Sequence, residues 1–544
     1  MCIRDRVAPF KIKKSQFDKL RESILNKSVM PSMRVMWAAG GALTENNITG
    51  YNCSYLKVDS PRAFDEALFI LMCGTGVGYS VEFEDVRRLP IVNDEFVGSE
   101  RVIRIEDSKA GWAKALRKHI ADLYLGRVHE FDYSNIRAAG AKLRTMGGRA
   151  SGPAPLESLL NFTTALFKKA AGRKLTPLEC HDLMCKIGEI VVVGGVRRSA
   201  MISLSDLGDY QLQGAKSGQW WDNFPHRALA NNSGVYLHKP DALTFMKEWT
   251  ALVESGSGER GIYSRYGAQN QAPDRRNKEL IHGTNPCAEI ALRSNQFCNL
   301  SEVVLRQSDT LVDVKHKIHM ATILGTMQST LTKFPYLRKS WTTNTEEERL
   351  LGVSLTGICD CPAIYNATPE QLEELKDYAI HVNKMWAKHL DIQESTAITT
   401  IKPSGTVSQL VNSASGIHGR FAPYYIRTVR GDNKDPLTTM MKDSGVPHEP
   451  CVMKPDSTTI FSFPIESPGD SVMANDLSAI EQLQLWLKFK KHWAEHSVSI
   501  TVYVRDNEWL EVGAWVYEHF DHLTGVSFLP YLSLIHISEP TRPY

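Results

Sequence analysis

Hydrophobic positions along the chain follow helical and strand-like periods in alternation. The run LTPLECHDLMCKIG (residues 175–188) has apolar residues at helical spacing, with Thr176 as N-cap, Pro177 at the first helical position and Glu179 completing a capping box. It leads directly into EIVVVGG (residues 189–195), a short apolar run that ends in two glycines. Such a run is typical of a buried strand, so we predict a helix followed by a strand here.

The same order of elements recurs twice towards the C-terminus. TPEQLEELKDYAIHVNKMWAKHL (residues 368–390) begins with a second capping box, and the strand-like TAITTI (residues 396–401) lies downstream. The helical run 479–496 precedes VSITVYV (residues 498–504), whose four alternate apolar residues would share one face of a strand. Helix-to-strand alternation without internal repeats or long linkers predicts one large α/β domain with much parallel strand pairing.

Composition and charge exclude several classes of protein. The chain has 544 residues, 42% of them hydrophobic and 23% charged, which is enough apolar material for a large core. The net charge is +2 and there is no block of Lys or Arg, which argues against a nucleic-acid groove. The longest apolar runs are too short to span a membrane, and the first residues lack the apolar segment of a secretory signal. We therefore expect a cytoplasmic protein that binds neither membranes nor nucleic acids.

The ten cysteines form neither a disulfide framework nor a zinc motif. No CxxC pair occurs, and Cys359 and Cys361 are too close in sequence for ordinary zinc-ligand spacing. We therefore expect reduced thiols, some of them with redox roles, and no bound metal ion.

The two ends of the sequence differ from the rest. MCIRDR (residues 1–6) and LSLIHISEPTRPY (residues 532–544) match no periodic element and resemble translated sequencing-adapter sequence. The alternative is that both are genuine tails. We expect residues 7–531 to form a single catalytic domain whose natural C-terminal end has been cut away, with artefactual sequence on either side.

Three glycine-rich segments are candidate binding loops. CGTGVGYSV (residues 73–81) is not a dinucleotide fingerprint, because a helix precedes it, a strand follows it and its spacing is GxGxG. IKPSGTVSQLV (residues 401–411) could hold an anion on the backbone N–H groups of a helix start, although an ordinary capped turn accounts for it equally well. VVVGGVRRSAMISL (residues 191–204) is either a solvated basic turn or a mobile loop whose Arg197 and Arg198 contact a nucleotide.

The stretch NPCAEIALRSNQFCNL (residues 285–300) carries the most specific chemistry. It holds an amide, a thiol and a carboxylate at the alternate positions Asn285, Cys287 and Glu289, and a second thiol, Cys298, eleven residues after the first. In an extended segment the first three side chains would point the same way. A lone cysteine is usually buried filler, but this combination predicts a reactive site.

Taken together, these motifs resemble the catalytic subunits of ribonucleotide reductases. The motifs are GYNCSYL, GTGVGYS, GGVRRSA, the Asn-x-Cys-x-Glu stretch with its second cysteine, LLGVSLTG and PSGTVS. The resemblance extends over nearly all of residues 7–531 and is greatest to the monomeric, adenosylcobalamin-dependent (class II) ribonucleoside-triphosphate reductases. It implies a ten-stranded α/β barrel with a finger loop through its centre.

The resemblance also implies a role for each residue of the cysteine site. Cys287 would carry a thiyl radical generated through adenosylcobalamin and abstract the ribose 3′ hydrogen, while Glu289 would take the 3′-hydroxyl proton. Asn285 would orient the substrate hydroxyls. Cys53 and Cys298 would supply the reducing electrons and end as a disulfide, which requires Cα atoms roughly 4.4–6.8 Å apart.

Further residues match nucleotide-binding positions of the family. The resemblance places the substrate phosphates on Pro403, Ser404, Gly405, Thr406 and Val407, and other substrate contacts on Ser32, Asn52 and Gly76. It assigns a loop that senses a dNTP or ATP effector to Gly194, Gly195, Val196, Arg197, Arg198 and Ser199. The expected reductant is thioredoxin or a similar dithiol, and the expected state is a monomer.

Three alternatives stay open. Ribonucleoside-diphosphate reductases, either dimeric class II enzymes or class I large subunits, share most of these motifs. An anaerobic glycyl-radical reductase would lack Glu289 and the pair Cys53 and Cys298. A regulatory protein that binds nucleotides on an inactive reductase scaffold would not need the complete set of five catalytic residues.

Overall fold

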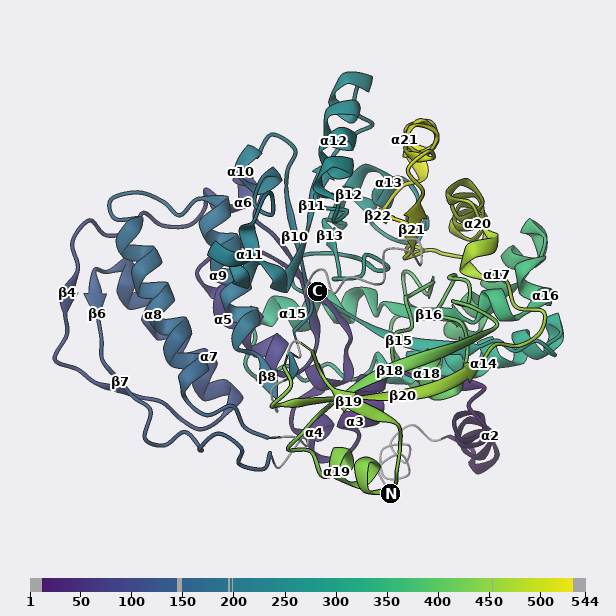
Figure 1. Cartoon of the computed structure of the whole chain (residues 1–544), viewed down its shortest axis with the longest axis horizontal. Helices are drawn as coiled ribbons and strands as arrows, with labels where there is room; N and C mark the ends of the chain where they lie inside the picture. The colour runs from purple at the N-terminus through teal and green to yellow at the C-terminus, as the bar shows by residue number, and fades with distance from the viewer. Residues whose placement is uncertain (1–11, 144–148, 194–195, 198, 453, 532–544) are drawn as a thin grey trace.

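Ten strands form one continuous path through the central sheet of the computed structural model (Figure 1). The structure describes residues 12–143, 149–193, 196–197, 199–452 and 454–531. The path runs through β17 (Thr399–Thr400), β16 (Leu351–Thr356), β15 (Gln296–Val304), β2 (Cys53–Lys57), β3 (Gly76–Ser80), β10 (Met201–Asp206), β11 (Ala230–Tyr236), β12 (Gly261–Ser264), β22 (Gly525–Pro530) and β21 (Thr501–Val504). An eleventh strand, β1 (Val29–Pro31), pairs with β15 off this path.

The two ends of the path meet, so the sheet closes into a barrel. Ile401, just after β17, forms a parallel bridge with Val498, just before β21. Its amide donates to the Ser497 carbonyl at 3.2 Å, and its carbonyl accepts from the Ser499 amide at 2.9 Å. The ten-stranded α/β barrel implied by the sequence is therefore confirmed.

The barrel consists of two halves, each of five parallel strands. Strands β2, β3, β10, β11 and β12 are mutually parallel, and so are β15, β16, β17, β21 and β22. The halves meet in antiparallel pairs at two seams, β2 with β15 and β12 with β22. The predicted parallel pairing is thus confirmed within each half.

Helices cover the outside of both halves (Figure 1). One group consists of α5 (Arg62–Met72), α7 (Lys109–Tyr124), α8 (Ala154–Lys169) and α9 (Pro177–Ile190), and the other includes α14 (Leu311–Gln328), α17 (Pro369–Leu390) and α20 (Ala479–His492). The capping boxes predicted before α9 and α17 are both present. In the strand predicted after α20, Val498, Ile500, Val502 and Val504 are all buried, which confirms the alternation.

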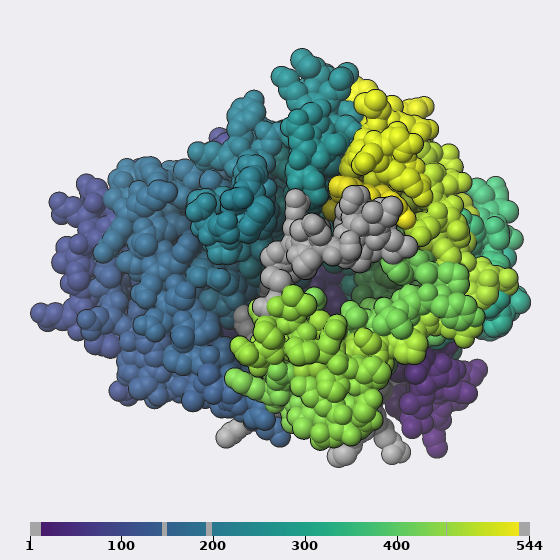
Figure 2. All heavy atoms as spheres, viewed as in Figure 1, coloured from purple at the N-terminus to yellow at the C-terminus, as the bar shows by residue number. Residues whose placement is uncertain are grey.

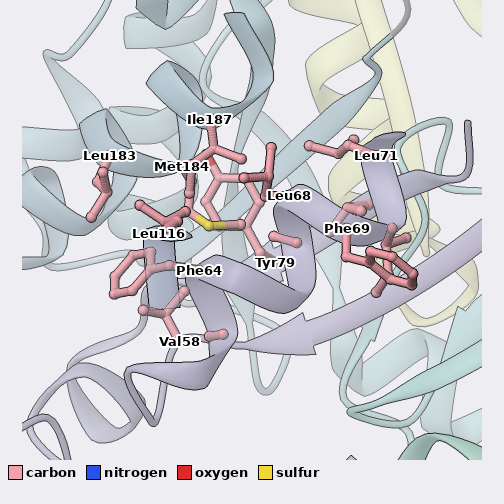
Figure 3. Packing of buried hydrophobic residues seen from close by; sticks show 14 of the residues in the cluster. Val58, Phe64, Leu68, Phe69, Leu71, Tyr79, Leu116, Leu183, Met184 and Ile187 are labelled. Carbon is pink, nitrogen blue, oxygen red and sulfur yellow. The ribbon is translucent and has the colours of Figure 1, made fainter. Parts of the chain in front are cut away.

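The largest part of the core lies between β3 and the first helical group. Figure 3 shows Phe64 and Leu68 from α5, Leu116 from α7 and Met184 from α9 packing around Tyr79 of β3. All five side chains are almost fully buried. Each large apolar side chain that is fully buried contributes roughly 1.5–3 kcal/mol, so this layer holds β3 firmly in the barrel wall.

One predicted strand is shorter than expected and lies outside the central sheet. Helix α9 continues to Ile190, and among the described residues that follow, Val192–Val193 (β8) pairs with Val196–Arg197 (β9) in a two-stranded sheet separate from the central one. The prediction of a buried strand over residues 189–195 is therefore wrong in its bounds and place. A short apolar run has the same pattern in a buried helix end as in a strand, so periodicity does not separate the two.

A separate three-stranded sheet lies on the face seen in Figures 1 and 2. It contains β18 (Tyr424–Asp432), β20 (Thr458–Glu466) and β19 (His448–Pro450), and Figure 2 shows a hollow in the surface above it. Across the described parts of the chain, no helix combines the length and the apolar character needed to cross a membrane.

A hairpin between the two halves passes through the barrel. It consists of β13 (Gly283–Thr284) and β14 (Ala291–Leu292), paired antiparallel. A Cβ atom on Gly78 of β3 would lie 1.8 Å from the Thr284 carbonyl oxygen, and one on Gly525 of β22 would lie 2.5 Å from the Ala288 Cβ. The Thr400 hydroxyl of β17 donates to the Glu289 carbonyl at 2.9 Å. Contacts with strands of both halves place the hairpin inside the barrel, as the finger loop implied by the sequence.

The close approach at Gly78 gives a testable prediction. In Gly78→Ala the added methyl group would have to displace the backbone at Thr284, so we expect the free energy of unfolding to fall by about 1–3 kcal/mol. Urea denaturation of the purified variant measures this. Gly98→Ala is the matched control, because a Cβ there meets nothing within 4 Å. Equal stability of the two variants would contradict the tight fit of the hairpin.

Candidate active site

The tip of the hairpin is a turn and not an extended segment. The Ala288 amide donates to the Asn285 carbonyl at 2.9 Å, and Ala288 has a left-handed φ of 60°. Pro286 occupies the second position of this turn, where its fixed φ suits a reversal of the chain. The prediction that Asn285, Cys287 and Glu289 alternate along a strand is therefore wrong, because Pro286 makes the chain turn at that point.

The turn nevertheless gives the three side chains different exposure to solvent. Asn285 and Glu289 are 3% and 2% exposed, whereas Cys287 is exposed. The Cys287 thiol can be reached by small molecules, but the surrounding protein removes most of the bulk water. This desolvation, together with the Glu289 carboxylate, raises the pKa of the thiol to about 12. Cys287 is thus an accessible, protonated thiol at the tip of a rigid element.

Glu289 has one carboxylate oxygen available for a ligand. Burial raises the pKa of this carboxyl group, while a hydrogen bond from Asn285 and the charge of Lys402 act in the opposite direction. Within the described structure, Oε2 of Glu289 is buried and makes no hydrogen bond. A buried carboxylate oxygen without a donor is costly, so it fits a site where a substrate hydroxyl would donate.

Cys53 and Cys298 lie directly opposite each other across the seam between β2 and β15. Directly opposed residues of an antiparallel pair have Cα atoms about 4.5–5.5 Å apart, within the range that a disulfide needs. Both thiols are free and buried, and the Cys53 Sγ lies 4.0 Å from Oε1 of Glu289. Burial, and next the Glu289 carboxylate, raises the pKa of Cys53 well above its usual range. The structure therefore brings the predicted thiol pair together beside the predicted base.

The predicted phosphate loop lies between β17 and the short helix α18 (Val407–Val411). The Ser404 hydroxyl donates to Oε2 of Glu302 at 2.5 Å and accepts from the Ser408 amide at 3.0 Å, so it serves the structure of the loop. Gly405 and Thr406 are exposed, and a Cβ on Gly405 would meet nothing within 4 Å. The open part of the loop is therefore its glycine and threonine.

Of the other predicted substrate contacts, Gly76 lies against the hairpin, whereas Ser32 and Asn52 make local backbone contacts. Ser32 is buried and caps α3 (Met33–Ala38), with its hydroxyl accepting from the Val35 amide at 3.4 Å. The Asn52 carbonyl accepts from the Gly76 amide at 3.0 Å. A Cβ on Gly76 would lie 2.9 Å from Cγ of Pro286, so this glycine makes room for the turn that carries Cys287.

The predicted effector loop is described only in part. Gly194, Gly195 and Arg198 lie outside the described residues, whereas Val196 and Arg197 form β9. Ser199 is buried, and its hydroxyl donates to the Gly188 carbonyl near the end of α9 at 2.8 Å. This hydrogen bond therefore holds the residues just before β10 against the end of α9.

Sequence reasoning missed a buried ion pair beside the phosphate loop. Lys402 Nζ lies 2.6 Å from Oε1 of Glu302, whose other oxygen accepts from Ser404 and, at 2.7 Å, from Thr356. Glu302 is fully buried and lies on the same face of β15 as Cys298, since four positions separate them. The even spacing of Cys298 and Glu302 along β15 was the sequence signal that the Glu302 carboxylate faces the barrel interior.

The closed barrel with an internal hairpin is the fold of ribonucleotide reductase catalytic subunits. A solved B12-dependent (class II) ribonucleotide reductase matches with a TM-score of 0.82 at 23% identity, over 96% of this chain and 84% of that one. The alpha subunit of the class Id ribonucleotide reductase of Actinobacillus ureae matches with a TM-score of 0.58 at 12% identity, over 98% and 93% of the two chains.

The sequence is similar to one branch of that fold in particular. An adenosylcobalamin-dependent ribonucleoside-triphosphate reductase of Euglena gracilis is 28% identical over 550 residues, which is 95% of this chain and 72% of that protein. The enzyme of the same name from Lactobacillus leichmannii is 27% identical over 623 residues, or 97% and 82% of the two chains. No family model matches the chain. The chain is similar to adenosylcobalamin-dependent ribonucleoside-triphosphate reductases over most of its length, which confirms the resemblance found in its sequence.

The raised thiol pKa of Cys287 predicts how the thiol reacts with iodoacetamide. Only the thiolate is alkylated, so with a pKa of about 12 the rate should rise about tenfold per pH unit from pH 7 to 10. Peptide mass spectrometry gives the rate for each cysteine. In the urea-unfolded chain the rate should instead level off near the ordinary thiol pKa of about 8.5. A plateau below pH 9 in the folded protein would show that the thiol is not desolvated in this way.

Proposed function

We propose that this protein reduces ribonucleoside triphosphates to 2′-deoxyribonucleoside triphosphates through a thiyl radical on Cys287. The observation that carries the proposal is the arrangement of the hairpin tip. An accessible thiol lies two residues from a buried carboxylate with a free oxygen, and that carboxylate lies 4.0 Å from one of two directly opposed thiols. These are the groups that radical removal of a 2′-hydroxyl needs.

The cofactor of this reaction is adenosylcobalamin, the cofactor named for the relatives. When bound, it supplies the one-electron chemistry that converts the Cys287 thiol into a thiyl radical. The observation that fits such a cofactor is that Cys287 is exposed while Asn285 and Glu289 beside it are buried. The accessible Cys287 thiol can be approached by a group that is not part of the chain.

The residues of the chain divide the reaction between them. The Cys287 radical takes the 3′ hydrogen of the ribose, Glu289 accepts the 3′-hydroxyl proton, and Asn285 holds the hydroxyls in place. A thiol of the Cys53 and Cys298 pair protonates the departing 2′-hydroxyl, which leaves as water. The pair gives two electrons and two protons and ends as a disulfide, and Cys287 returns its hydrogen to the 3′ carbon. One nucleotide and two thiols thus yield one deoxynucleotide, one disulfide and one water.

Nucleotide binding and regulation follow the same scheme. The substrate phosphates bind at residues 403–407, where Gly405 and Thr406 are exposed, and Ser32, Asn52 and Gly76 border the ribose. Residues 194–199 respond to a dNTP or ATP effector, with a coupling free energy of about 1–3 kcal/mol. The chain acts as a monomer and is re-reduced by thioredoxin or a similar dithiol. Cys53, Cys287 and Cys298 are free thiols, which supports a reducing, cytoplasmic location.

Removal of the Cys287 sulfur tests the radical role. We expect Cys287→Ala to retain less than about one part in a thousand of the deoxynucleotide formation, because an obligatory reacting group is lost, while nucleotide binding persists. Product chromatography and equilibrium dialysis measure the two quantities. Cys451→Ala is the control, since Cys451 follows β19 in the separate sheet. Turnover by Cys287→Ala above that level would exclude a radical on Cys287.

The identity of the radical source is tested separately. The purified protein should form deoxynucleotides when adenosylcobalamin and a dithiol are the only additions, because the thiol that receives the radical is accessible on this chain. An added di-iron subunit should have no effect. Activity that depends on such a subunit and not on cobalamin would favour the class I alternative.

A further inference from the structure

Two buried arginines hold the hairpin that carries Cys287, one on each strand. Arg265 lies at the start of α13 (Arg265–Asn270), directly after β12. Its Nε donates to the His282 carbonyl, next to β13, at 2.7 Å. Its two terminal nitrogens donate to Oε1 and Oε2 of Glu82 at 3.1 and 2.5 Å. The guanidinium therefore links the root of β13 to a carboxylate beyond the end of β3.

Arg276 makes the equivalent set of bonds on the other strand. Its Nη2 donates to the Ala291 carbonyl of β14 at 3.0 Å. Its Nε and Nη2 donate to Oε1 and Oε2 of Glu348 at 3.1 and 3.0 Å. Glu348 is the last residue of α15 (Lys339–Glu348) and also accepts from the Gln296 amide group at 2.6 Å. The second arginine thus links β14 to the other half of the barrel.

Burial makes these contacts strong and specific. Arg265 and Arg276 are 8% and 4% exposed, and their glutamates are similarly buried. A guanidinium presents its donors in a fixed planar fork, so one side chain can satisfy a carboxylate and a carbonyl together. Loss of either arginine would leave a buried carboxylate without its partner, which is strongly unfavourable. The two pairs therefore fix both strands of the hairpin relative to the barrel wall.

We propose that Arg265 and Arg276 are positioning residues that set the place of Cys287 relative to Glu289 and the Cys53–Cys298 pair. Neither arginine reacts. Each holds one strand of the hairpin to one half of the barrel, so the tip keeps its position when substrate enters. The proposal rests on the proposed function in so far as Cys287 acts on the substrate.

The same region offers a different interpretation, as a metal site. Glu82, Asp85 and His282 place ligand atoms within 4.8 Å of one another. Both carboxylates already have cationic partners, however, since Arg265 binds Glu82 and Lys57 Nζ lies 3.3 Å from Asp85. The His282 Nδ1 is 2.8 Å from the Tyr55 hydroxyl. All three groups are thus already engaged by other side chains of the protein.

The experiment compares Arg265→Lys and Arg276→Lys with the wild-type protein. A lysine keeps the positive charge but cannot bind a carbonyl and both carboxylate oxygens at once. Hydrogen exchange, followed by mass spectrometry, should show faster exchange of residues 283–292 with the rest of the barrel unchanged. Because a displacement of about 1 Å can lower a rate about 100-fold, we expect kcat to fall about 10- to 100-fold while the dissociation constant of the nucleotide changes less than about twofold.

Arg260→Lys is the matched control. Arg260 is 5% exposed, donates to both oxygens of Glu248 at 2.9 Å and binds the carbonyls of Asp206 and Leu207, but not the hairpin. This variant should leave both the hairpin exchange and kcat near the wild-type values. If the lysine variants do not fold, Glu82→Gln and Glu348→Gln test the same contacts, because each removes the charge that orients its arginine.

The outcomes separate this proposal from the proposed function. Unchanged exchange of the hairpin overturns it, and so does faster exchange with a kcat equal to that of Arg260→Lys. A parallel loss of nucleotide affinity and kcat overturns it as well, because the arginines would then support the fold of the whole site. If wild-type protein forms no deoxynucleotides but the hairpin still loosens in the variants, the proposed function fails while the structural link stands.

Discussion

The fit of a two-stranded hairpin inside a ten-stranded barrel is the constraint on which the rest of this structure depends. The barrel interior has no room for a side chain at Gly78 or Gly525, and little at Gly76. Strand β3 shows how the sequence leaves this space for the hairpin. Its glycines alternate with Val77 and Tyr79, which are buried on the other side among the helices. One strand thereby provides empty space towards the hairpin and large apolar side chains towards the core.

The two-half construction determines where the chemistry is assembled. The thiol pair lies at the seam between β2 and β15, and the tip of the hairpin touches β22, which belongs to the other seam. The chain between β12 and β15 supplies the hairpin and both arginines that hold it. A single connection between the two halves thus carries Cys287 and its supports, while the walls carry Cys53, Cys298 and the loop at residues 403–407.

Sequence reasoning succeeded where the signal was local or came as a set of motifs. The capping boxes of α9 and α17 fix helix starts through contacts three residues apart, so they could be recognised directly. The barrel was predicted from the resemblance to a known family and not from the periodicity of the sequence. The prediction of an extended hairpin tip was wrong because it relied on the alternation of Asn285, Cys287 and Glu289. Pro286, which lies between the first two, indicated a turn. The arginine contacts have no local signal, since Glu82 lies 183 residues from Arg265 and Glu348 lies 72 from Arg276.

The opposed cysteines have a further consequence for the stability of the fold. A bond between Cys53 and Cys298 would close a loop of about 245 residues, for which the chain-entropy model gives a stabilisation of about 5.5 kcal/mol. In a thermodynamic cycle, the free energy that a bond adds to the folded state is also the amount by which folding opposes its reduction. Catalytic turnover would therefore alternate between two barrels of different resistance to unfolding, and the reductant would act against the fold as well as against the sulfur–sulfur bond.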